Sequence, residues 1–356
     1  MPPFRIELRS DTQTVPTPDM RTAMAKAEVG DEWSGEDPTV LELERTAARL
    51  FNREAGVLVP SGTMGNLTSL LALSERGDTV LVDSMSHMVG EGGNYAVAGG
   101  CNLLTIETTG ILTADLIRER LDSSIIGANR ASVIWTENTH NVHGGVAWGP
   151  QIMKDIVSLA SERGLRVHVD GARVFNAATK EQVPVSALTA GADTVQFCLS
   201  KGLGAPFGSV VVGSSTTIKQ VARYKKMLGG AMRQAGVMAA AGLVALHDGP
   251  ARLAEDHANA HRLGELLSHI DGFELVYPVE TNMVFVRVDP GVIDQSAFLA
   301  AARADGVGVA DIRPGNRLRF VTHHQVNRNA IDEAGMILRD AAAIAPTHKA
   351  SATTIK

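Results

Sequence analysis

The chain alternates between two hydrophobic periodicities. Short runs of β-branched and aliphatic residues predict buried strands, and between them apolar residues recur every three or four positions, as in amphipathic helices. Strands are predicted at 55–60, 78–83, 131–137, 166–170, 193–200 and 209–213, and helices at 18–27, 39–52, 62–76, 150–164 and 183–191. This alternation is typical of an α/β fold with a mostly parallel sheet covered by helices on both faces.

The last third of the chain has a different order of elements. A long helical pattern runs from 232 to 270, and we expect it to break near the HDGP sequence at 247–250. Strands at 282–288, 306–311 and 317–323 then mix with helices at 296–305 and 328–344, which predicts a smaller α+β domain. The expected division is an N-terminal arm at 1–20, a large domain at 21–250, a small C-terminal domain at 251–345 and a disordered tail at 346–356.

Composition narrows the class of protein. The formal net charge of −6 over 356 residues does not suggest a nucleic-acid or anionic-membrane partner. No apolar stretch is long enough to span a bilayer, and the N-terminus lacks a signal-peptide hydrophobic region. The two cysteines cannot make a disulfide framework and suit a reducing compartment. We therefore expect a cytoplasmic protein, and the 35 glycines fit an α/β enzyme with tight turns.

Polar groups follow three of the predicted strands. The strand at 131–137 leads into ENTHN at 137–141, the next ends at Asp170, and Lys201 follows the third, 31 residues after Asp170. In an open parallel sheet the carboxyl ends of the strands gather the functional groups. The short connections between these strands predict that they are neighbours, and that an acid and an amine meet at one edge.

One cofactor accounts for an acid and an amine held in this way. Pyridoxal phosphate needs a lysine to bond with its aldehyde and an aspartate to keep its ring nitrogen protonated, so that the ring can accept an electron pair from the substrate. The sequence VPSGTMGN at 59–66 adds a strand exit, a turn and a helix start. Helix N-termini bind phosphate, and Ser61 and Thr63 add hydroxyl groups.

With these motifs in place, the chain resembles the low-specificity L-threonine aldolase family over roughly residues 5–345. The matching segments are LRSDTQT at 8–14, GEDPTV at 35–40, VPSGTMGN at 59–66, ENTHN at 137–141, HVDGARVFNAA at 168–178, LSKGLGAPFGS at 199–209, KMLGGAMRQAG at 226–236, LAEDHANAHRL at 253–263, ETN at 280–282 and RFVTHH at 319–324. The resemblance implies the type I pyridoxal-phosphate fold, with a seven-stranded sheet in the large domain. It also implies a homodimer or homotetramer with shared active sites.

The resemblance assigns cofactor-binding and catalytic roles. Lys201 would bond to pyridoxal phosphate, Asp170 would pair with the ring nitrogen, and His87 would stack on the ring; these three would be the catalytic residues. Arg233 would reach the phosphate of a neighbouring subunit. Three residues at one helix start would hold the phosphate: Ser61, Gly62 and Thr63.

The substrate would be a small β-hydroxy-α-amino acid. Ser10, Arg173 and Arg319 would hold its α-carboxylate, and Arg173 would also contact the cofactor. The implied reaction is retro-aldol cleavage of L-threonine, L-allo-threonine or an aryl analogue such as phenylserine to glycine and an aldehyde. Amino-acid racemisation, β-elimination and aldol transfer on the same scaffold stay open as alternatives. A non-catalytic cofactor-binding protein is a more remote one.

Three segments depart from the family pattern. Ser34 stands where family members often have tyrosine, the segment at 87–95 is one residue short and lacks the family's usual aromatic residues after His87, and the loop at 123–132 has no histidine. All three would face the substrate β-substituent. They therefore affect which substrate is expected and which reaction follows, and they do not affect the expected cofactor.

Ordinary structural roles are the alternatives for single residues. Asp170 could cap a helix, Arg173 could form an ion pair, Arg319 could face solvent from its strand, and His140 could tie down its loop. The pairs His140/His143 and His323/His324 have no third ligand at a suitable sequence spacing, so no catalytic transition metal is predicted. The resemblance leaves a structural cation open, since some family members bind one near the site.

Overall fold

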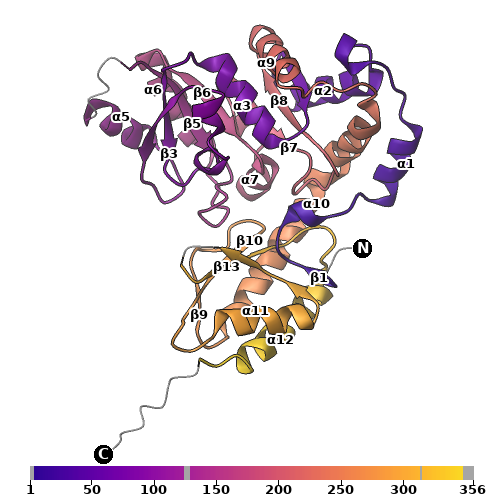
Figure 1. Ribbon diagram of the computed structural model, residues 1–356, viewed down its shortest axis with the longest axis vertical. Helices are drawn as coiled ribbons and strands as arrows, with labels where there is room; N and C mark the ends of the chain where they lie inside the picture. The colour runs from indigo at the N-terminus through magenta and orange to yellow at the C-terminus, as the bar shows by residue number, and fades with distance from the viewer. Residues whose placement is uncertain (1–3, 124–128, 313–314, 348–356) are drawn as a thin grey trace, which may run out of the picture. The chain divides into compact units, whose positions relative to one another are not determined.

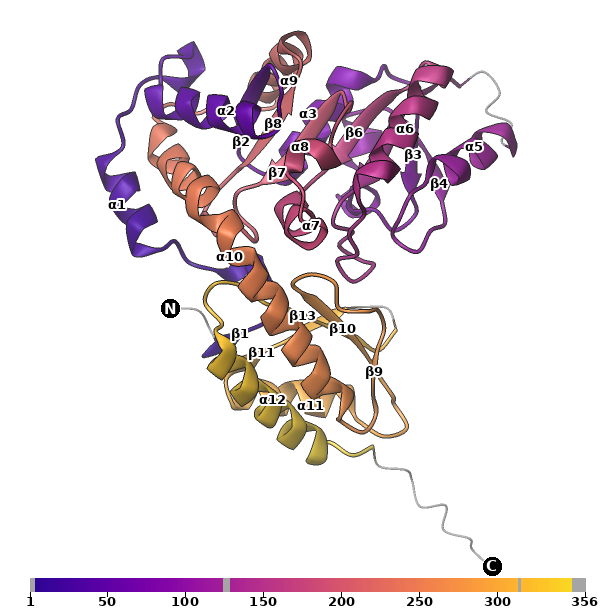
Figure 2. The ribbon, with the colours of Figure 1, turned by 180° about the vertical axis from the view of Figure 1, so that it is seen from behind.

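The computed structural model describes residues 4–123, 129–312 and 315–347. The chain divides into two compact units, one of residues 15–254 and one of residues 1–14 together with 255–356 (Figures 1 and 2). Most of the predicted C-terminal tail, at 348–356, and part of the loop at 123–132 lie outside the described residues.

The larger unit is built on a seven-stranded sheet with the order β2-β8-β7-β6-β5-β3-β4. β8 runs antiparallel to both of its neighbours, and the other adjacent strands are parallel. The predicted α/β class and the mostly parallel sheet are therefore confirmed. The strands are β2 (Ala55–Val59), β3 (Thr79–Asp83), β4 (Asn102–Ile106), β5 (Ala131–Glu137), β6 (Arg166–Asp170), β7 (Thr194–Cys198) and β8 (Ser209–Gly213).

Helices pack along the sheet. α3 contacts β7, β8 and α9, while α6 packs with β6, α5 and α8. The helices of this unit are α1 (Pro18–Lys26), α2 (Pro38–Leu50), α3 (Gly62–Leu73), α4 (Asn94–Val97), α5 (Ala114–Ser123), α6 (Pro150–Arg163), α7 (Val174–Glu181), α8 (Val185–Leu188) and α9 (Ser215–Met227). Among the described residues there are three short 3₁₀ segments: η1 (Asp11–Gln13), η2 (Glu32–Ser34) and η3 (His87–Gly90).

Helix α2 shows how the local sequence sets these elements. Asp37 caps its N-terminus by accepting a hydrogen bond from the Val40 N–H, and Pro38 occupies the first turn, where no amide hydrogen is needed. Val40, Leu43 and Ala47 recur at helical spacing and are buried. The helix therefore forms where capping and burial agree.

The smaller unit is an α+β arrangement, as predicted. Its main sheet is antiparallel with the order β12-β13-β10-β9, and a separate parallel pair joins β1 to β11. α11 (Gln295–Ala304) and α12 (Arg328–Ala343) contribute buried apolar faces to its core, with Phe298 and Leu338 fully buried. The strands are β1 (Ile6–Glu7), β9 (Phe273–Leu275), β10 (Met283–Val288), β11 (Val307–Gly308), β12 (Ala310–Ile312) and β13 (Arg317–Val321).

The predicted break near 247–250 is wrong. α10 (Gly236–Ser268) runs without interruption, with Pro250 inside it. Proline removes one helical hydrogen bond, but Leu246 and Leu253 on either side of it are buried. Burial of these side chains outweighs the local cost, so the helix continues. In the described part of the chain, no helix has both the length and the apolarity needed to cross a membrane.

Candidate active site

The carboxyl ends of three parallel strands meet at one edge of the sheet. β5 pairs with β6 so that Glu137 lies beside Asp170, and β6 pairs with β7 so that Asp170 lies beside Gln196. The sequence prediction that these strands are neighbours is confirmed. Lys201 follows β7 by three residues, which brings the amine to the same edge.

A cavity of about 270 Å³ opens at this edge. Six of the residues predicted from the sequence line it: Ser61, Gly62, Thr63, His87, Asp170 and Lys201. Its remaining lining comes from these residues: Pro60, Asn66, Glu91, Ala172, Gln196, Cys198, Ser200, Pro206, Phe207 and Gly208. The carboxylate, the amine and one helix start are thus parts of a single site.

The start of α3 forms one wall of the cavity. The Ser61 hydroxyl oxygen accepts a hydrogen bond from the Met64 N–H and so caps the helix. Gly62 lies so close to β7 that a β-carbon there would be 2.9 Å from Cys198 Sγ. Glycine therefore allows the first turn to lie against the sheet, and the N–H groups of a first turn, which have no partner within the helix, would stabilise an anion there.

Asp170 is a buried carboxylate in the cavity wall. Its Oδ2 accepts a hydrogen bond from Asn66 Nδ2 at 2.8 Å, and its Oδ1 accepts one from the Ala172 N–H at 3.1 Å. Neither donor is cationic. Burial raises the pKa of Asp170, the nearby Glu137 carboxylate raises it further, and the Lys201 ammonium opposes this rise. A cationic group bound in the cavity would therefore be favoured beside Asp170.

The Asn66 side chain links α3 to β6 and to Glu91. Its amide nitrogen donates to Asp170 and, at 3.1 Å, to Glu91 Oε1, while its oxygen lies 3.3 Å from Nε2 of His168. His168 is fully buried, and its Nδ1 lies 2.8 Å from the Thr194 hydroxyl. Both N–H bonds of the amide are used, so Asn66 holds the two carboxylates in fixed positions.

His87 stands at the mouth of the cavity with its side chain 41% exposed. Its Nδ1 lies 3.0 Å from Glu91 Oε1, and the Glu91 side chain is only 2% exposed. The hydrogen bond with Glu91 raises the pKa of His87, although partial burial opposes the rise. Glu91 therefore both orients the imidazole and favours its protonated form.

Glu137 fixes the backbone beneath His87. Its Oε2 accepts hydrogen bonds from the His87 N–H at 2.8 Å and the Ser86 hydroxyl at 3.0 Å, and its Oε1 accepts one from the Asn141 N–H at 2.8 Å. Burial alone would raise the pKa of Glu137, but the His140 imidazole and these N–H donors lower it. The ENTHN segment thus holds the histidine turn against the sheet.

The chain is similar in sequence to a known family and to several named proteins. Residues 7–290 match the family model described as beta-eliminating lyase. The chain is 41% identical over 332 residues to a probable low-specificity L-threonine aldolase 2 of Arabidopsis thaliana, covering 90% of this chain and 93% of that one. It is 39% identical over 331 residues to the low specificity L-threonine aldolase of Escherichia coli K12, covering 92% and 96%.

The chain belongs to the low-specificity L-threonine aldolase family. The fold agrees: the structure of a Leishmania major threonine aldolase superposes with a TM-score of 0.81 at 18% identity, covering 95% of this chain and 99% of that one. The type I fold, the lyase class and the family expected from the sequence are confirmed. Members of this aldolase family use pyridoxal phosphate.

Four other residues that the aldolase resemblance singles out are not among those lining the cavity. Arg173 immediately precedes α7, is buried, and donates from Nη1 to Asn141 Oδ1 at 3.2 Å. Arg233 is largely exposed and pairs with Asp31 at 3.3 Å. Ser10 and Arg319 belong to the smaller unit, where Nη2 of Arg319 donates to the carbonyl oxygen of Arg9 at 3.2 Å. Their roles stay predictions.

Asn66, Glu91 and Gln196 line the cavity but were not among the predicted residues. Asn66 lies within the VPSGTMGN motif, and Glu91 is four residues after His87, one helical turn along the chain. Those two spacings were available signals. Gln196 gives none, because it lies inside an apolar strand pattern; its Oε1 is buried and makes no hydrogen bond within the described part of the chain.

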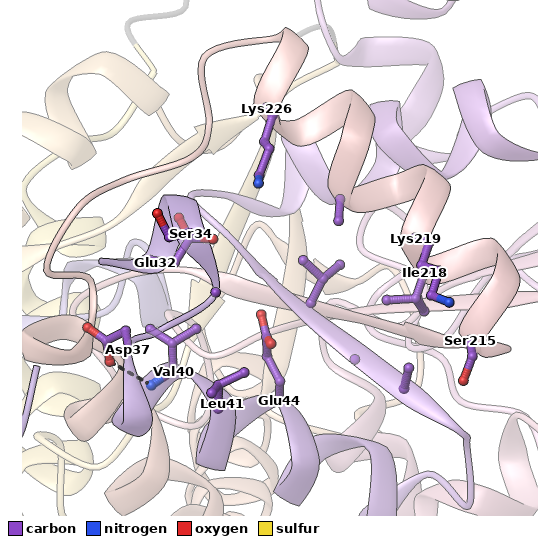
Figure 3. Close-up of a pocket in the computed structure, with 15 residues that line it drawn as sticks. Glu32, Ser34, Asp37, Val40, Leu41, Glu44, Ser215, Ile218, Lys219 and Lys226 are labelled. Atoms are coloured by element: carbon purple, nitrogen blue, oxygen red, sulfur yellow. Dashed lines mark hydrogen bonds between the residues drawn. The ribbon is translucent and has the colours of Figure 1, made fainter. Parts of the chain in front are cut away.

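A second hollow, of about 330 Å³, lies between α2, β2 and α9 (Figure 3). Glu44 lines it, and burial raises the pKa of that carboxyl to about 7 although the Leu58 N–H donates to it. At its rim are Glu32 and Lys226. None of the residues predicted for aldolase chemistry lines this hollow, so it is not the candidate active site.

Proposed function

We propose that this chain is a pyridoxal-phosphate-dependent aldolase that cleaves small β-hydroxy-α-amino acids to glycine and an aldehyde. The observation that carries the proposal is the shared cavity, which holds Asp170, Lys201, His87 and the start of α3 together. The curated relatives with about 40% identity over about 90% of the chain support the reaction class.

The residues of the cavity fit the cofactor. Asp170 is a buried acid whose two partners are neutral, which suits a protonated ring nitrogen. Gly62 and Thr63 stand in the first turn of α3, where N–H groups have no partner within the helix and suit a phosphate dianion, and Lys201 supplies the amine. The buried Gln196 Oε1 leaves an acceptor in the cavity wall for a ligand donor. Pyridoxal phosphate, when bound, supplies an electron sink for the electron pair released by bond cleavage.

The protein residues then have distinct tasks. Asp170, fixed by Asn66, keeps a positive charge favourable at one end of the cavity, and His87, fixed by Glu91, covers its mouth. In the overall reaction the β-hydroxyl proton leaves, the Cα–Cβ bond breaks, and the β-carbon becomes an aldehyde. The α-carbon then takes a proton and glycine forms, with no net oxidation or reduction. Arg173, Arg319 and Ser10 are proposed to bind the carboxylate.

The proposed substrates are L-threonine, L-allo-threonine and aryl analogues such as phenylserine. From the segment at 87–95, His87 and Glu91 line the cavity, whereas Tyr95 does not. A cavity to which this segment contributes no phenylalanine, tyrosine or tryptophan side chain favours bulky β-substituents. We also propose a homodimer or homotetramer in the cytosol. The exposed Arg233 is available to a neighbouring subunit, and the two cysteines are free and buried.

A substrate panel tests the proposal. Purified protein is incubated with pyridoxal phosphate and each β-hydroxy amino acid, and aldehyde and glycine are both measured. We expect equimolar release from at least one substrate, loss of release and of borohydride-sensitive yellow colour in Lys201→Ala, and no change in the exposed control Lys219→Ala. Exchange of the α-proton without cleavage would indicate racemisation instead.

A further inference from the structure

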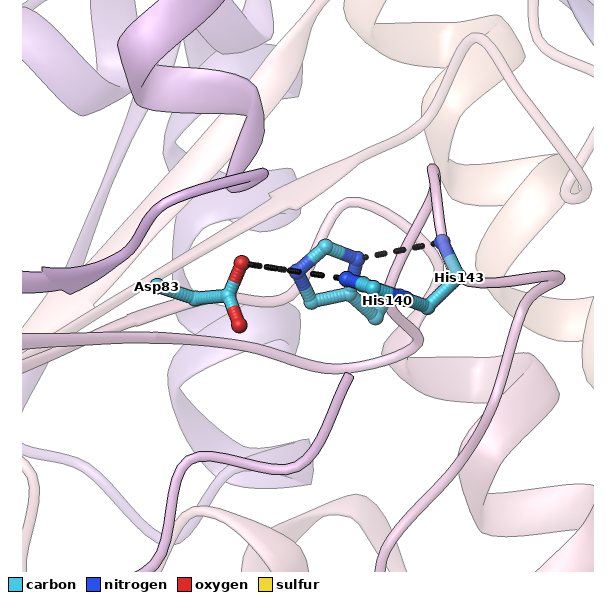
Figure 4. A group of neighbouring side chains, drawn as sticks. All are labelled: Asp83, His140 and His143. Atoms are coloured by element: carbon cyan, nitrogen blue, oxygen red, sulfur yellow. Dashed lines mark hydrogen bonds and ion pairs between the residues drawn. The ribbon is translucent and has the colours of Figure 1, made fainter. Parts of the chain in front are cut away.

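Three metal-ligating side chains meet beside the candidate active site. The carboxylate Oδ1 of Asp83, at the end of β3, lies 3.3 Å from Nε2 of His140 and 4.0 Å from Nε2 of His143 (Figure 4). One potential ligand atom from each of the three residues lies within 4.8 Å of the others. The sequence gives a histidine pair without a nearby third ligand, and the fold supplies Asp83 from 57 residues earlier.

The turn that carries the two histidines is closed by its own backbone. The His140 N–H donates to the Val146 carbonyl at 2.9 Å, and the Gly145 N–H donates to the His140 carbonyl at 2.9 Å. Gly110 packs against this turn: a β-carbon there would lie 2.6 Å from the β-carbon of His143, and its φ of +99° favours glycine. Both imidazoles are therefore held toward Asp83 before any ligand arrives.

Asp83 is held in the same way. Its Oδ2 accepts a hydrogen bond from the Thr108 hydroxyl, and its Oδ1 accepts one from the Met85 N–H at 2.7 Å. Thr108 is itself fixed, because its Oγ1 accepts from the Gly110 N–H at 2.8 Å. Hydrogen bonds to a ligating carboxylate orient it, and such outer partners are typical of built metal sites.

We propose that Asp83, His140 and His143 bind one divalent transition metal ion of the zinc class. Two imidazole nitrogens and one carboxylate oxygen suit zinc, whereas calcium and magnesium prefer oxygen ligands. Ligand atoms about 2.0–2.2 Å from a tetrahedral zinc lie roughly 3.3–3.6 Å apart. The Asp83–His140 distance already has this value, and the Asp83–His143 distance of 4.0 Å must shorten by roughly 0.4–0.7 Å. The two imidazole nitrogens lie within 4.8 Å of one another and must approach by up to roughly 1.5 Å.

Binding has one local cost. The His143 N–H lies 3.4 Å from Nδ1 of His140, which is long for a hydrogen bond. Zinc on Nε2 leaves the proton of His140 on Nδ1, so this contact opens when the metal binds. The bound ion would link Asp83, at the end of β3, to His140 and His143 in the turn after β5. Glu137, three residues before His140, holds the His87 backbone, so the metal stiffens the support of the active-site histidine.

Metal analysis of the intact, cofactor-loaded enzyme tests the proposal without an activity assay. Protein free of any polyhistidine tag is stripped with chelator, titrated with Zn²⁺, and its metal content is measured by mass spectrometry. We expect one tightly bound Zn²⁺ per chain in the wild type and in His247→Ala, whose imidazole is exposed on α10. His143→Ala should bind Zn²⁺ at least about tenfold more weakly.

Cobalt substitution keeps the test independent of variant folding. Co²⁺ bound to the wild type should give visible d–d bands that Zn²⁺ displaces, and histidine NMR signals of His140 and His143 should shift on Zn²⁺ binding. His143→Ala should keep the far-ultraviolet circular dichroism and the cofactor colour of the wild type, because His143 does not line the cofactor cavity. The proposal is overturned if the wild type binds no stoichiometric zinc or if His143→Ala binds it as tightly.

Discussion

Asn66, the fifth residue of α3, donates a 2.8 Å hydrogen bond to the carboxylate of Asp170 at the end of β6. The same amide donates to Glu91, which holds His87. The start of α3 is proposed to bind the phosphate. Through Asn66, the same helix also positions Asp170, which is proposed to face the cofactor ring, and His87, which is proposed to cover it. Loss of one residue should disturb both ends of the cofactor cavity.

Replacement of Asn66 by alanine should weaken cofactor binding. A hydrogen bond to a charged group contributes about 1.5–3 kcal/mol, so the dissociation constant of pyridoxal phosphate should rise about ten- to a hundredfold. Titration of apoenzyme with cofactor, followed by absorbance, measures the change. Asn94→Ala is the matched control, because Asn94 donates to Glu91 but not to Asp170. Equal affinity in Asn66→Ala and wild type would contradict the role of Asn66.

Replacement of Glu91 by glutamine should lower the pKa of His87. The wild-type hydrogen bond raises that pKa, so His87 stabilises the fold most fully below its unfolded-state pKa and loses this contribution as the pH rises through the folded-state pKa. In Glu91→Gln the loss should occur at lower pH. NMR titration of the His87 ring, assigned with His87→Gln, measures both values. Asp248→Asn, which alters the exposed pair with His247, should leave His87 unchanged.

The buried His168 should make the enzyme less stable in acid. Burial lowers its pKa to about 3, whereas the unfolded chain has a histidine pKa near 6.5. Below about pH 6.5 the unfolded state therefore binds a proton that the folded state excludes, and the free energy of unfolding falls by up to about 1.4 kcal/mol per pH unit. Denaturant unfolding between pH 4 and pH 7 measures this slope.

In His168→Gln the acid slope should be shallower, whatever the absolute loss of stability. His257, whose pKa burial lowers to about 4, should keep part of the slope in the variant. His269→Gln, at an exposed position, should keep the full wild-type slope. An unchanged slope in His168→Gln would show that His168 is protonated in the folded state.

Loss of the ion pair between Lys225 and Glu32 should lower the free energy of unfolding far more than loss of the neighbouring Lys226 amine. Lys225 is 1% exposed, and its Nζ lies 2.6 Å from Glu32 Oε1. Lys225→Met removes the cation from a carboxylate that is 9% exposed and keeps the Met232 N–H as a donor, so the change should cost about 3–5 kcal/mol. Lys226→Met removes an exposed amine that donates to the Trp33 carbonyl and should cost under about 1 kcal/mol. Chemical denaturation compares the two, and similar losses would contradict this assignment.

The sequence predicts the framework of the sheet because periodicity and strand exits are local properties. β5, β6 and β7 with their terminal polar residues are examples, since each is a short apolar run bounded by polar groups. β4 (Asn102–Ile106) was not predicted, because it is a half-exposed strand without a continuous buried run. α10 was misjudged at Pro250, where burial of Leu246 and Leu253 decides the outcome and the local signal does not.

Some features of the candidate site can likewise be found from the sequence, and others depend on the fold. Lys201 and Asp170 follow strands and can be found from spacing, whereas the link from Asn66 to Asp170 joins residues 104 apart in sequence. The meeting of Asp83 with His140 likewise depends on β3 and β5 being neighbours, which no single stretch encodes. The missed contacts are those that depend on which strands become neighbours.

The smaller unit takes its residues from both ends of the chain. β1 (Ile6–Glu7) pairs with β11 (Val307–Gly308), and Nε2 of His323 lies 2.8 Å from the Glu7 carbonyl oxygen. During synthesis at roughly 5–20 residues per second, β1 must wait on the order of 15–60 seconds until β11 is made. All residues of the larger unit, 15–254, have been synthesised before then, so this unit should fold first in the nascent chain. A short deletion at the N-terminus should therefore damage the part of the protein that is made last.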